Sequence, residues 1–333
     1  MKNLLLILLI MMCAMAFVTA QTIDYSDMED SFESFSSDLA EALPYASTTG
    51  LNWSDAYLGG FPHFGVGVTV GFVSLPSDGF EEVADVLGVE LPDLVTSYGI
   101  GVPLPAYTFD ARLGIPVLPI DVGVKGGALS ASISDVGIDY LLLGGDVRWG
   151  VMKGGAIKPD ISIGLGYNYL SGGIYMDDVV DGETFYLGDI DYGISGYDYI
   201  EISDGDLYYE WDSHVIDAKV QVSKGFLILK PSVGIGYSYG FTEAGGGIDA
   251  TVSASDGTTS TTLTSDDISD IESVLGMDLS DTGLSIFTED NAGALRLWGG
   301  CQFNIAVLKL DLSAVYNVTS QSLGGSLNAR IQL

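Results

Sequence analysis

The chain has 333 residues and carries 45 acidic against 12 basic side chains, which gives a formal net charge of −33. This charge excludes nucleic acid as a natural partner, because the phosphate backbone would be repelled. With 44 glycines and 18 tyrosines, the composition is typical neither of an ordinary helical domain nor of a disordered acidic tail.

Residues 1–20 are predicted to be a secretory signal peptide, with an apolar stretch over Leu4–Phe17 and small residues at the cleavage site. That stretch is short for a membrane-spanning helix, which needs about 20 apolar residues. Cleavage removes Cys13 and leaves Cys301 alone, so no intrachain disulfide and no cysteine-based metal site is expected. We also expect no bound metal and no cofactor.

An amphipathic helix is predicted over residues 24–43, inside an N-terminal region that covers residues 21–60. Ser26 and Glu29 fit a capping box at its start. Apolar side chains then recur at spacings of four and three and form one stripe: Met28, Phe32, Phe35, Leu39 and Leu43. We expect Pro44 to end this helix and a polar connector to follow.

The remaining residues, 61–333, alternate apolar and small polar side chains with a period of two, which is the period of a β-strand. The stretches Lys158–Leu170 and Lys230–Tyr239 show this most clearly, and each ends in a pair of tyrosines. The residues predicted to face lipid in them are Ile161, Ile163, Leu165, Val233 and Ile235. Those predicted to face inward are Ser162, Gly164, Ser232 and Gly234. An aliphatic face that ends in aromatics is typical of strands that cross an outer membrane to an interfacial girdle.

We predict ten strands, and the pattern is compatible with eight to fourteen. They cover residues 62–74, 106–115, 120–128, 138–151, 158–170, 213–223, 228–241, 294–306, 308–318 and 323–333. Short turns alternate with long connections at 75–104, 172–211 and 243–291. The predicted fold is therefore all-β, a closed antiparallel transmembrane β-barrel.

The charge of the connections predicts how the barrel is oriented. Residues 172–211 and 243–291 each hold eleven acids and no Lys or Arg, whereas lysines gather at the short turns. We expect the acidic connections to be extracellular and the short turns to face the periplasmic leaflet, where anionic lipid is available. Small helices are also expected near 80–91 and 265–275, and the carboxylates between 177 and 210 could bind Ca²⁺.

Charged residues inside the strands fall opposite the aliphatic face and are predicted to line the lumen, since a charge facing lipid at mid-membrane costs about 2–4 kcal/mol. They are Asp110, Arg112, Asp121, Lys125, Asp146, Arg148, Asp217, Lys219, Arg296, Asp311 and Arg330. The doublets Asp110/Arg112, Asp146/Arg148 and Asp217/Lys219 put opposite signs side by side on one strand. Such a ladder of ion pairs either ties and fills the lumen or forms a permeation path of mixed charge.

The apolar stripe of the predicted helix needs cover, and the glycine-lined lumen offers it. We expect residues 24–43 to lie within the barrel or against its periplasmic mouth, with helix acids paired to lumen bases. Deleting them should then raise conductance. The alternative is a free periplasmic helix or a segment that binds a partner.

One short motif could carry chemistry. In Asp212-Ser213-His214, the carboxylate could orient the imidazole to activate water. The motif resembles the Asp-x-His pair of the omptins, a family of ten-stranded outer-membrane proteases. A second acidic pair of that family is not found here, so we expect the chain not to be an enzyme and keep a hydrolase as a remote alternative.

The chain as a whole resembles bacterial outer-membrane β-barrel proteins in its signal, strand pattern and loop asymmetry. The stretch from Asn52 to Gly65 is similar to one in barrels of spirochaete-like bacteria, although the chain ends in Ile331-Gln332-Leu333 and not in an aromatic residue. The resemblance implies a location in the bacterial outer membrane, with outer-membrane lipid and the barrel-assembly machinery as partners. We expect a small-solute channel or uptake barrel with a plugged or narrow lumen. The alternative is a structural or adhesive surface barrel that acts through its acidic loops.

Overall fold

The computed structural model describes residues 25–58, 62–75, 102–133, 136–155, 157–180, 183–186, 199–255, 260–262, 279–280 and 283–333. The predicted signal peptide and the two small helices predicted near 80–91 and 265–275 lie outside these residues.

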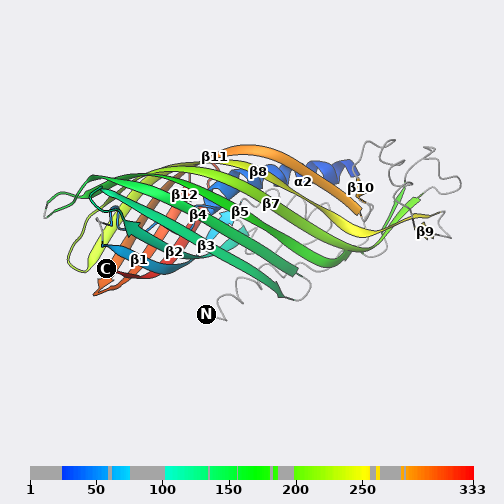
Figure 1. Ribbon diagram of the computed structural model, residues 1–333. Coiled ribbons are helices and arrows are strands. Elements are labelled where there is room, and N and C mark those ends of the chain that lie inside the picture. The colour runs from blue at the N-terminus through cyan, green and yellow to red at the C-terminus, as the bar shows by residue number, and fades with distance from the viewer. Residues whose placement is uncertain are drawn as a thin grey trace.

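Ten long antiparallel strands form the wall of a closed barrel (Figure 1). They are β1 (Phe64–Leu75), β2 (Val102–Gly114), β3 (Ile120–Ile133), β4 (Val136–Met152), β5 (Asp160–Val180), β7 (Tyr199–Ser223), β8 (Leu229–Ser255), β11 (Gly283–Ile305), β12 (Leu308–Asn317) and β13 (Leu323–Gln332). Three short strands, β6 (Glu183–Tyr186), β9 (Ser260–Thr262) and β10 (Leu279–Ser280), extend it. Because β13 pairs with β1 and β8 pairs with β11, the sheet has no open edge, and the predicted ten-stranded barrel is confirmed.

The two faces of the wall separate as the alternation predicts. Leu165 is 67% exposed and Val233 is 61% exposed, whereas the neighbouring Ser162 and Ser232 are buried. Aromatic side chains lie at both edges of the exposed apolar band, with Trp149 and Phe303 near the short turns and Tyr239 toward the other end. On β8 about ten residues separate these levels, which corresponds to about 25 Å across the membrane at the usual rise and tilt.

Strand length differs greatly around the barrel. β12 and β13 have 10 residues each, whereas β5, β7, β8 and β11 have 21, 25, 27 and 23. The long strands continue as a curved wall beyond the aromatic level, at what we call the long-strand end (Figure 1). The opposite end, where β2–β3, β4–β5, β7–β8 and β11–β12 are joined, is the short-turn end.

The extended wall corrects the predicted loops at 172–211 and 243–291, because their described parts are largely strand. Trp211 is buried on the inner face, and its neighbours Glu210 and Asp212 point outward. Above the membrane the outer face meets water and not lipid, so its side chains are acidic. The alternation therefore continues there with polar residues outside, and a search for aliphatic faces ends the strands too early.

Helix α2 (Tyr25–Ala46) lies inside the barrel and packs against β8 and β11 (Figure 1). It ends three residues later than predicted, since Pro44 is accommodated in its last turn. Its described side chains begin at Ser34, so we call residues 34–46 the lumen helix and residues 47–58 the lumen connector. In the described part of the chain, no helix has the length and apolar character needed to cross a membrane.

Candidate functional site

The structure places all eleven predicted lumen charges on the inner face of the wall, where each is at most 7% exposed. They are Asp110, Arg112, Asp121, Lys125, Asp146, Arg148, Asp217, Lys219, Arg296, Asp311 and Arg330. Buried charges need partners, because an isolated charge away from water is strongly unfavourable. The partners of these residues therefore decide what the lumen can do.

The observed ion pairs join different strands, and the predicted pairing inside each sequence doublet is wrong. Arg112 binds Asp121 at 2.5 Å and Asp146 at 2.7 Å. Arg148 binds Asp121 at 2.8 Å, and those two residues are direct cross-strand partners. Opposite residues on neighbouring strands lie about 5 Å apart, whereas residues two apart on one strand are separated by about 6.6 Å. For Asp121 and Arg148 the cross-strand partner is therefore the nearer one.

The network continues around the wall in the same way. Lys219 on β7 reaches Asp146 on β4 at 2.7 Å, across the intervening β5. Arg296 on β11 binds Asp217 on β7 at 2.7 Å, across β8. Each of these pairs skips one strand, so the strand between must carry very small side chains at that level.

Glycines provide that space. Gly123 on β3 is the register partner of both Arg112 and Asp146. A Cβ atom at Gly123 would lie 2.6 Å from Asp146 Oδ1 and 2.9 Å from the Arg112 guanidinium. A Cβ atom at Gly164 on β5 would lie 3.2 Å from the side chain of Lys219, which crosses β5 to reach Asp146. The inward glycines of the strand pattern are therefore the gaps through which the ion pairs meet.

Trp53 of the lumen connector is the largest side chain enclosed by this network, at 1% exposed. The guanidinium groups of Arg330 and Arg112 lie 4.3 Å and 5.6 Å from the centre of its ring, within the range of cation–π attraction. Its indole N–H donates to Asp110 Oδ2 at 3.2 Å. An apolar ring in the centre of the lumen is thereby held by charged residues of the wall.

Asp55, also in the connector, is the acid that binds the lumen bases. Its carboxylate pairs with Lys230 and, at 3.1 Å, with Arg330, and it accepts a hydrogen bond from the Gln332 amide at 2.9 Å. Its main-chain carbonyl accepts from Arg148 at 2.6 Å. We predicted this pairing for acids of the helix, whereas Glu41 of the helix is exposed. Asp55 was missed because it lies in a polar stretch without periodicity. The signal that could have found it is the excess of bases over acids on the predicted lumen wall.

The main chain of the connector is bound by side chains of the wall. Amide N–H groups of Ser54, Ala56 and Leu58 donate to Asp311, Ser223 and Asp121 at 3.0, 3.1 and 3.0 Å. The Gln221 amide donates to the carbonyl of Trp53 at 2.6 Å. Irregular backbone at membrane depth is tolerated where protein satisfies its polar groups, and this wall does so.

Lys125 marks the boundary between helix and connector. Its ammonium group donates to the carbonyl oxygens of Ser47 and Thr49, at 2.5 Å each. Helix α2 has no basic residue in its own last turn. The wall therefore supplies the positive charge that favours a helix C-terminus. A cavity of about 10 Å³ remains beside Lys125, Thr48 and Leu51, at the lower limit for one water molecule.

The lumen helix is held mainly by apolar contacts. Phe35 packs edge-on against Tyr209, with ring centres 4.1 Å apart, and Leu39 and Leu43 are buried. Two polar contacts of its residues with the wall are long. Tyr45 donates to the carbonyl of Val315 at 3.3 Å, and Ser37 donates to Asp290 at 3.4 Å. Ser37 itself is exposed, so one side of the helix meets solvent.

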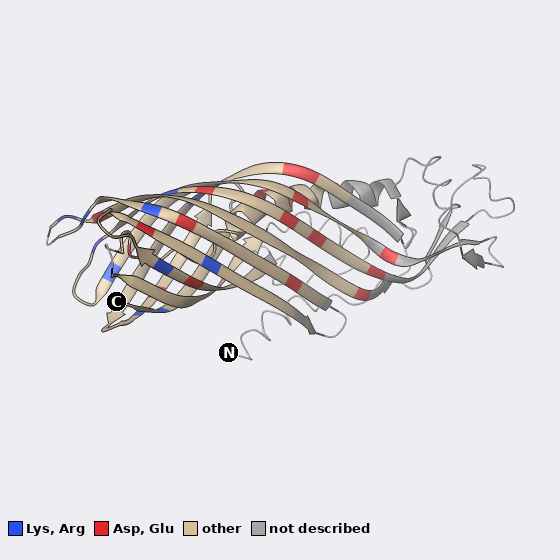
Figure 2. Cartoon of the chain, in the orientation of Figure 1, with Lys and Arg blue, Asp and Glu red and all other residues tan. Residues whose placement is uncertain are grey.

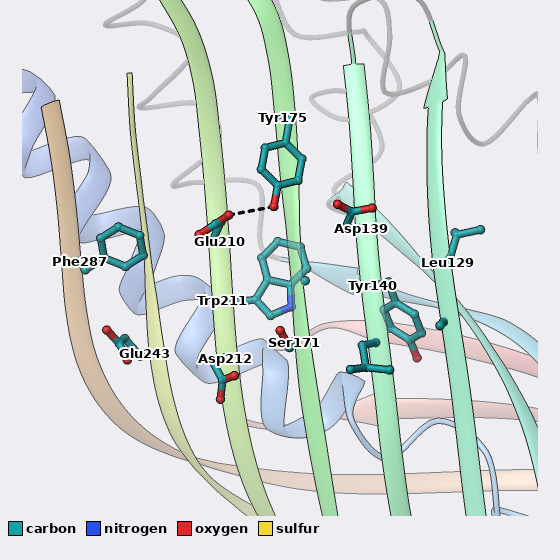
Figure 3. Close-up of a pocket in the computed structure, with 13 residues that line it drawn as sticks. Leu129, Asp139, Tyr140, Ser171, Tyr175, Glu210, Trp211, Asp212, Glu243 and Phe287 are labelled. Atoms are coloured by element: carbon teal, nitrogen blue, oxygen red, sulfur yellow. Dashed lines mark hydrogen bonds between the residues drawn. The ribbon is translucent and has the colours of Figure 1, made fainter. Parts of the chain in front are cut away.

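A second candidate site lies on the outer face of the extended wall. It is a groove of about 640 Å³ that crosses β3, β4, β5, β7, β8 and β11 (Figure 3). Its labelled residues include Asp139, Glu210 and Glu243, and Tyr175 donates to Glu210 at 2.8 Å. Two residues that line the groove, Asp212 and Glu243, form a row of successive cross-strand partners with Glu289. Like charges in direct opposition repel, so this row is not arranged for stability.

The predicted Asp212–His214 pair also lies on this outer face, away from the lumen. His214 Nε2 is 3.5 Å from Asp212 Oδ1, and both side chains are about half exposed. The other ring nitrogen is 2.6 Å from the Tyr167 hydroxyl, and Tyr169 donates to Asp212. The imidazole is therefore flanked by two tyrosines, Tyr167 and Tyr169, and remains half exposed. Within the described ranges, no group of three or more metal-ligating side chains is found.

Comparisons with known proteins leave the role of the protein undefined. The sequence matches no known family profile and no curated protein. Similar solved structures include the outer membrane protease OmpT from Escherichia coli, at 9% identity and a TM-score of 0.36 over 84% of this chain and 97% of that one. The translocator domain of the autotransporter NalP from Neisseria meningitidis has 9% identity and a TM-score of 0.32 over 87% and 91%. The toluene transporter TbuX from Ralstonia pickettii has 13% identity and a TM-score of 0.26 over 82% and 89%.

The closed barrel with its lipid-facing band decides the location. The chain is a β-barrel protein of the bacterial outer membrane. The finer resemblance to barrels of spirochaete-like bacteria stays a prediction. The expectation that the chain is not an enzyme is corrected, because a protease is among the similar structures and this architecture therefore does not exclude catalysis.

Proposed function

We propose that the protein is an outer-membrane channel for small polar solutes and that the lumen connector, residues 47–58, holds it closed. The observation that carries this proposal is the Asp55 clamp. A carboxylate from the connector is bound by Lys230, Arg330 and Gln332 of the wall, and the connector's amides are bound by wall side chains. A wall that only needed to be stable would be filled by apolar side chains, which stabilise a core at least as well as buried ion pairs do.

The wall that remains when the connector is removed supports passage of polar solutes of either charge. The eleven charged residues buried in the described wall are six bases and five acids, so they carry no strong excess of one sign. Inward glycines such as Gly123 and Gly164 keep the wall thin at the level of the ion pairs. A ten-stranded barrel without its connector would therefore contain a narrow, water-filled path of mixed charge.

The proposal includes an orientation, with the long-strand end at the cell surface. Figure 2 shows acidic residues along the extended strands, while basic residues are grouped toward the short turns. Lys153, Lys158 and Lys224 belong to those turns. Basic residues are favoured beside anionic phospholipid of the periplasmic leaflet.

Single-channel conductance in planar bilayers tests the function. In one variant, residues 47–58 are replaced by a flexible Gly/Ser linker of the same length, and in the matched variant residues 25–41 are deleted, which leaves the connector in place. We expect the wild type and the deletion variant to conduct little and the linker variant to conduct clearly. The proposal thus replaces the expectation from the sequence that loss of the helix alone raises conductance. Altered gel migration on heating shows whether each barrel is folded. A folded linker variant that conducts no better than the wild type would refute the channel.

A structural or adhesive surface barrel is the second candidate, and the carboxylate row on the outer face favours it. Asp212, Glu243 and Glu289 oppose one another directly at a cost to stability. Conversion of all three to their amides should stabilise the barrel in detergent. If the row serves adhesion, the same variant should lose binding of cells to a cationic surface. If the lumen serves transport, its conductance should be unchanged.

A further inference from the structure

The path of the chain through the lumen is fixed by two contacts with the same strand. Phe35 of the lumen helix packs on Tyr209 of β7, and the amide of Ala56 in the connector donates to Ser223 of β7. Ser223 is the last residue of β7, at the short-turn end. Between the two contacts β7 rises about 46 Å along its length, or about 35 Å along the barrel axis at a tilt of about 40°.

The chain therefore enters at the long-strand end and descends to the short-turn end. The intermediate contacts lie in this order. Pro44 lies beside Gly240 of β8, and Lys125 of β3 binds the main chain at Ser47. Leu58 then reaches Asp121 near the start of β3. The next strand, β1, begins at Phe64 on the short-turn side, so the connector leads directly into the barrel wall.

The helix also begins well outside the membrane. Tyr209 lies seven positions beyond Ile216, the register partner of the girdle residue Tyr167, toward the long-strand end. Helix α2 begins at Tyr25, ten residues before Phe35, which adds about 15 Å of helix in the same direction. In Figure 1 the first turns of α2 accordingly lie close to β10 at the long-strand end.

We propose that the mature chain displays its N-terminal end at the cell surface and passes through its own barrel from outside to inside. The proposal rests on the orientation given under the proposed function. It replaces the predicted alternative of a free periplasmic helix, because a chain that enters from the outer side has no N-terminal segment left in the periplasm. A partner of this segment must therefore be extracellular, and a peptide attached before residue 25 would be presented to the surroundings of the cell.

Epitope tags read with an antibody that cannot cross the outer membrane test this topology in the full-length protein. One tag is inserted after Gln21, following the predicted cleavage site. A second is inserted after Ser320, in the β12–β13 turn at the long-strand end, and a third after Gly225, in the β7–β8 turn. A Cβ atom at Gly225 would meet no atom within 4 Å, so this turn offers room.

We expect the tags at Gln21 and Ser320 to be detected on intact cells, with no further gain after permeabilisation, and the tag at Gly225 to be detected only after permeabilisation. A tag at Gln21 that needs permeabilisation while the tag at Ser320 does not would overturn the inference and leave the orientation intact. A tag at Gly225 accessible on intact cells, with Ser320 hidden, would overturn both.

A cysteine variant removes the concern that an inserted tag itself changes the path. Ser37→Cys in a Cys301→Ser background places a single thiol on the exposed side of the lumen helix. A membrane-impermeant maleimide should label it on intact cells to the same extent as on permeabilised cells. Labelling that appears only after permeabilisation would contradict surface entry of the chain. Gly225→Cys in the same background is the periplasmic control.

Discussion

The lumen helix and the lumen connector fill the same barrel by different means. The helix, residues 34–46, satisfies its own backbone and contacts the wall through Phe35, Leu39 and Leu43, while Ser37 and Glu41 face solvent. The connector, residues 47–58, has no regular structure, and its amides, its carbonyls and the Asp55 carboxylate are bound by the wall. The regular element is thus the more loosely held of the two, and closure of the lumen depends on the irregular one.

The difference has a cause in hydrogen bonding. A helix requires little polar chemistry from its surroundings, so an apolar stripe is enough to dock it. An irregular segment at membrane depth requires a partner for every polar group, and only a polar wall supplies them. A wall built in this way remains polar when the segment is absent. The same polar side chains therefore hold the connector in place and would line the proposed polar path when the connector is absent.

Among the substitutions that compare the connector with the helix, removal of the Asp55 carboxylate should cause the largest loss of stability. Asp55→Ala leaves Lys230 and Arg330 with one carboxylate partner fewer each, and we expect about 3 kcal/mol of destabilisation. Urea unfolding of the barrel in detergent measures it. Glu41→Gln, in the exposed face of the helix, should change stability by less than about 0.5 kcal/mol. Equal losses in the two variants would mean that the connector is not the more firmly held region.

An added methyl group at Gly123 should cause the next largest loss of stability. In Gly123→Ala the Cβ would lie 2.6 Å from Asp146 Oδ1 and 2.8 Å from a methyl of Leu51 in the connector. We expect the ion pair or the connector to shift, at a cost of about 2 kcal/mol. Gly225→Ala, where a Cβ meets no atom within 4 Å, is the matched control. If Gly123→Ala is as stable as the wild type, the wall has room for a methyl group at this level.

Loss of the lysine at the boundary should have a smaller effect. Lys125→Met keeps the length of the side chain but removes the ammonium group that binds the carbonyls of Ser47 and Thr49. We expect a loss of about 1 kcal/mol, because a favourable charge at the helix C-terminus is removed. Lys153→Met in an exposed turn is the control. If both variants unfold at the same urea concentration as the wild type, Lys125 does not join the two regions.

The barrel could be predicted from sequence because its wall obeys a local rule. In β5 and β8 lipid and lumen alternate with every residue, so Leu165 and Ser162 reveal the face of the whole strand. The eleven charged residues to which the same rule was applied are buried in the described wall. It failed at the extended parts of β7 and β8, where water replaces lipid on the outer face and the aliphatic signal disappears.

The candidate site was less predictable, because its partners are distant in sequence. Arg330 and Asp55 are 275 positions apart, and no local pattern connects them. The doublet Asp146/Arg148 suggested a pair within one strand, yet each residue binds a partner on another strand. Which charges meet depends on strand register and on glycines such as Gly123, and both become visible only when the strands are paired.

Amide hydrogen exchange tests the central claim most directly, since it compares the two regions within one molecule. The amides of Ser54, Ala56 and Leu58 donate to wall side chains and can open only when the connector leaves the wall. We predict that they exchange roughly tenfold or more slowly than the amides of residues 35–41, which corresponds to about 1.4 kcal/mol or more of additional protection. Faster exchange in the connector than in the lumen helix would contradict the account.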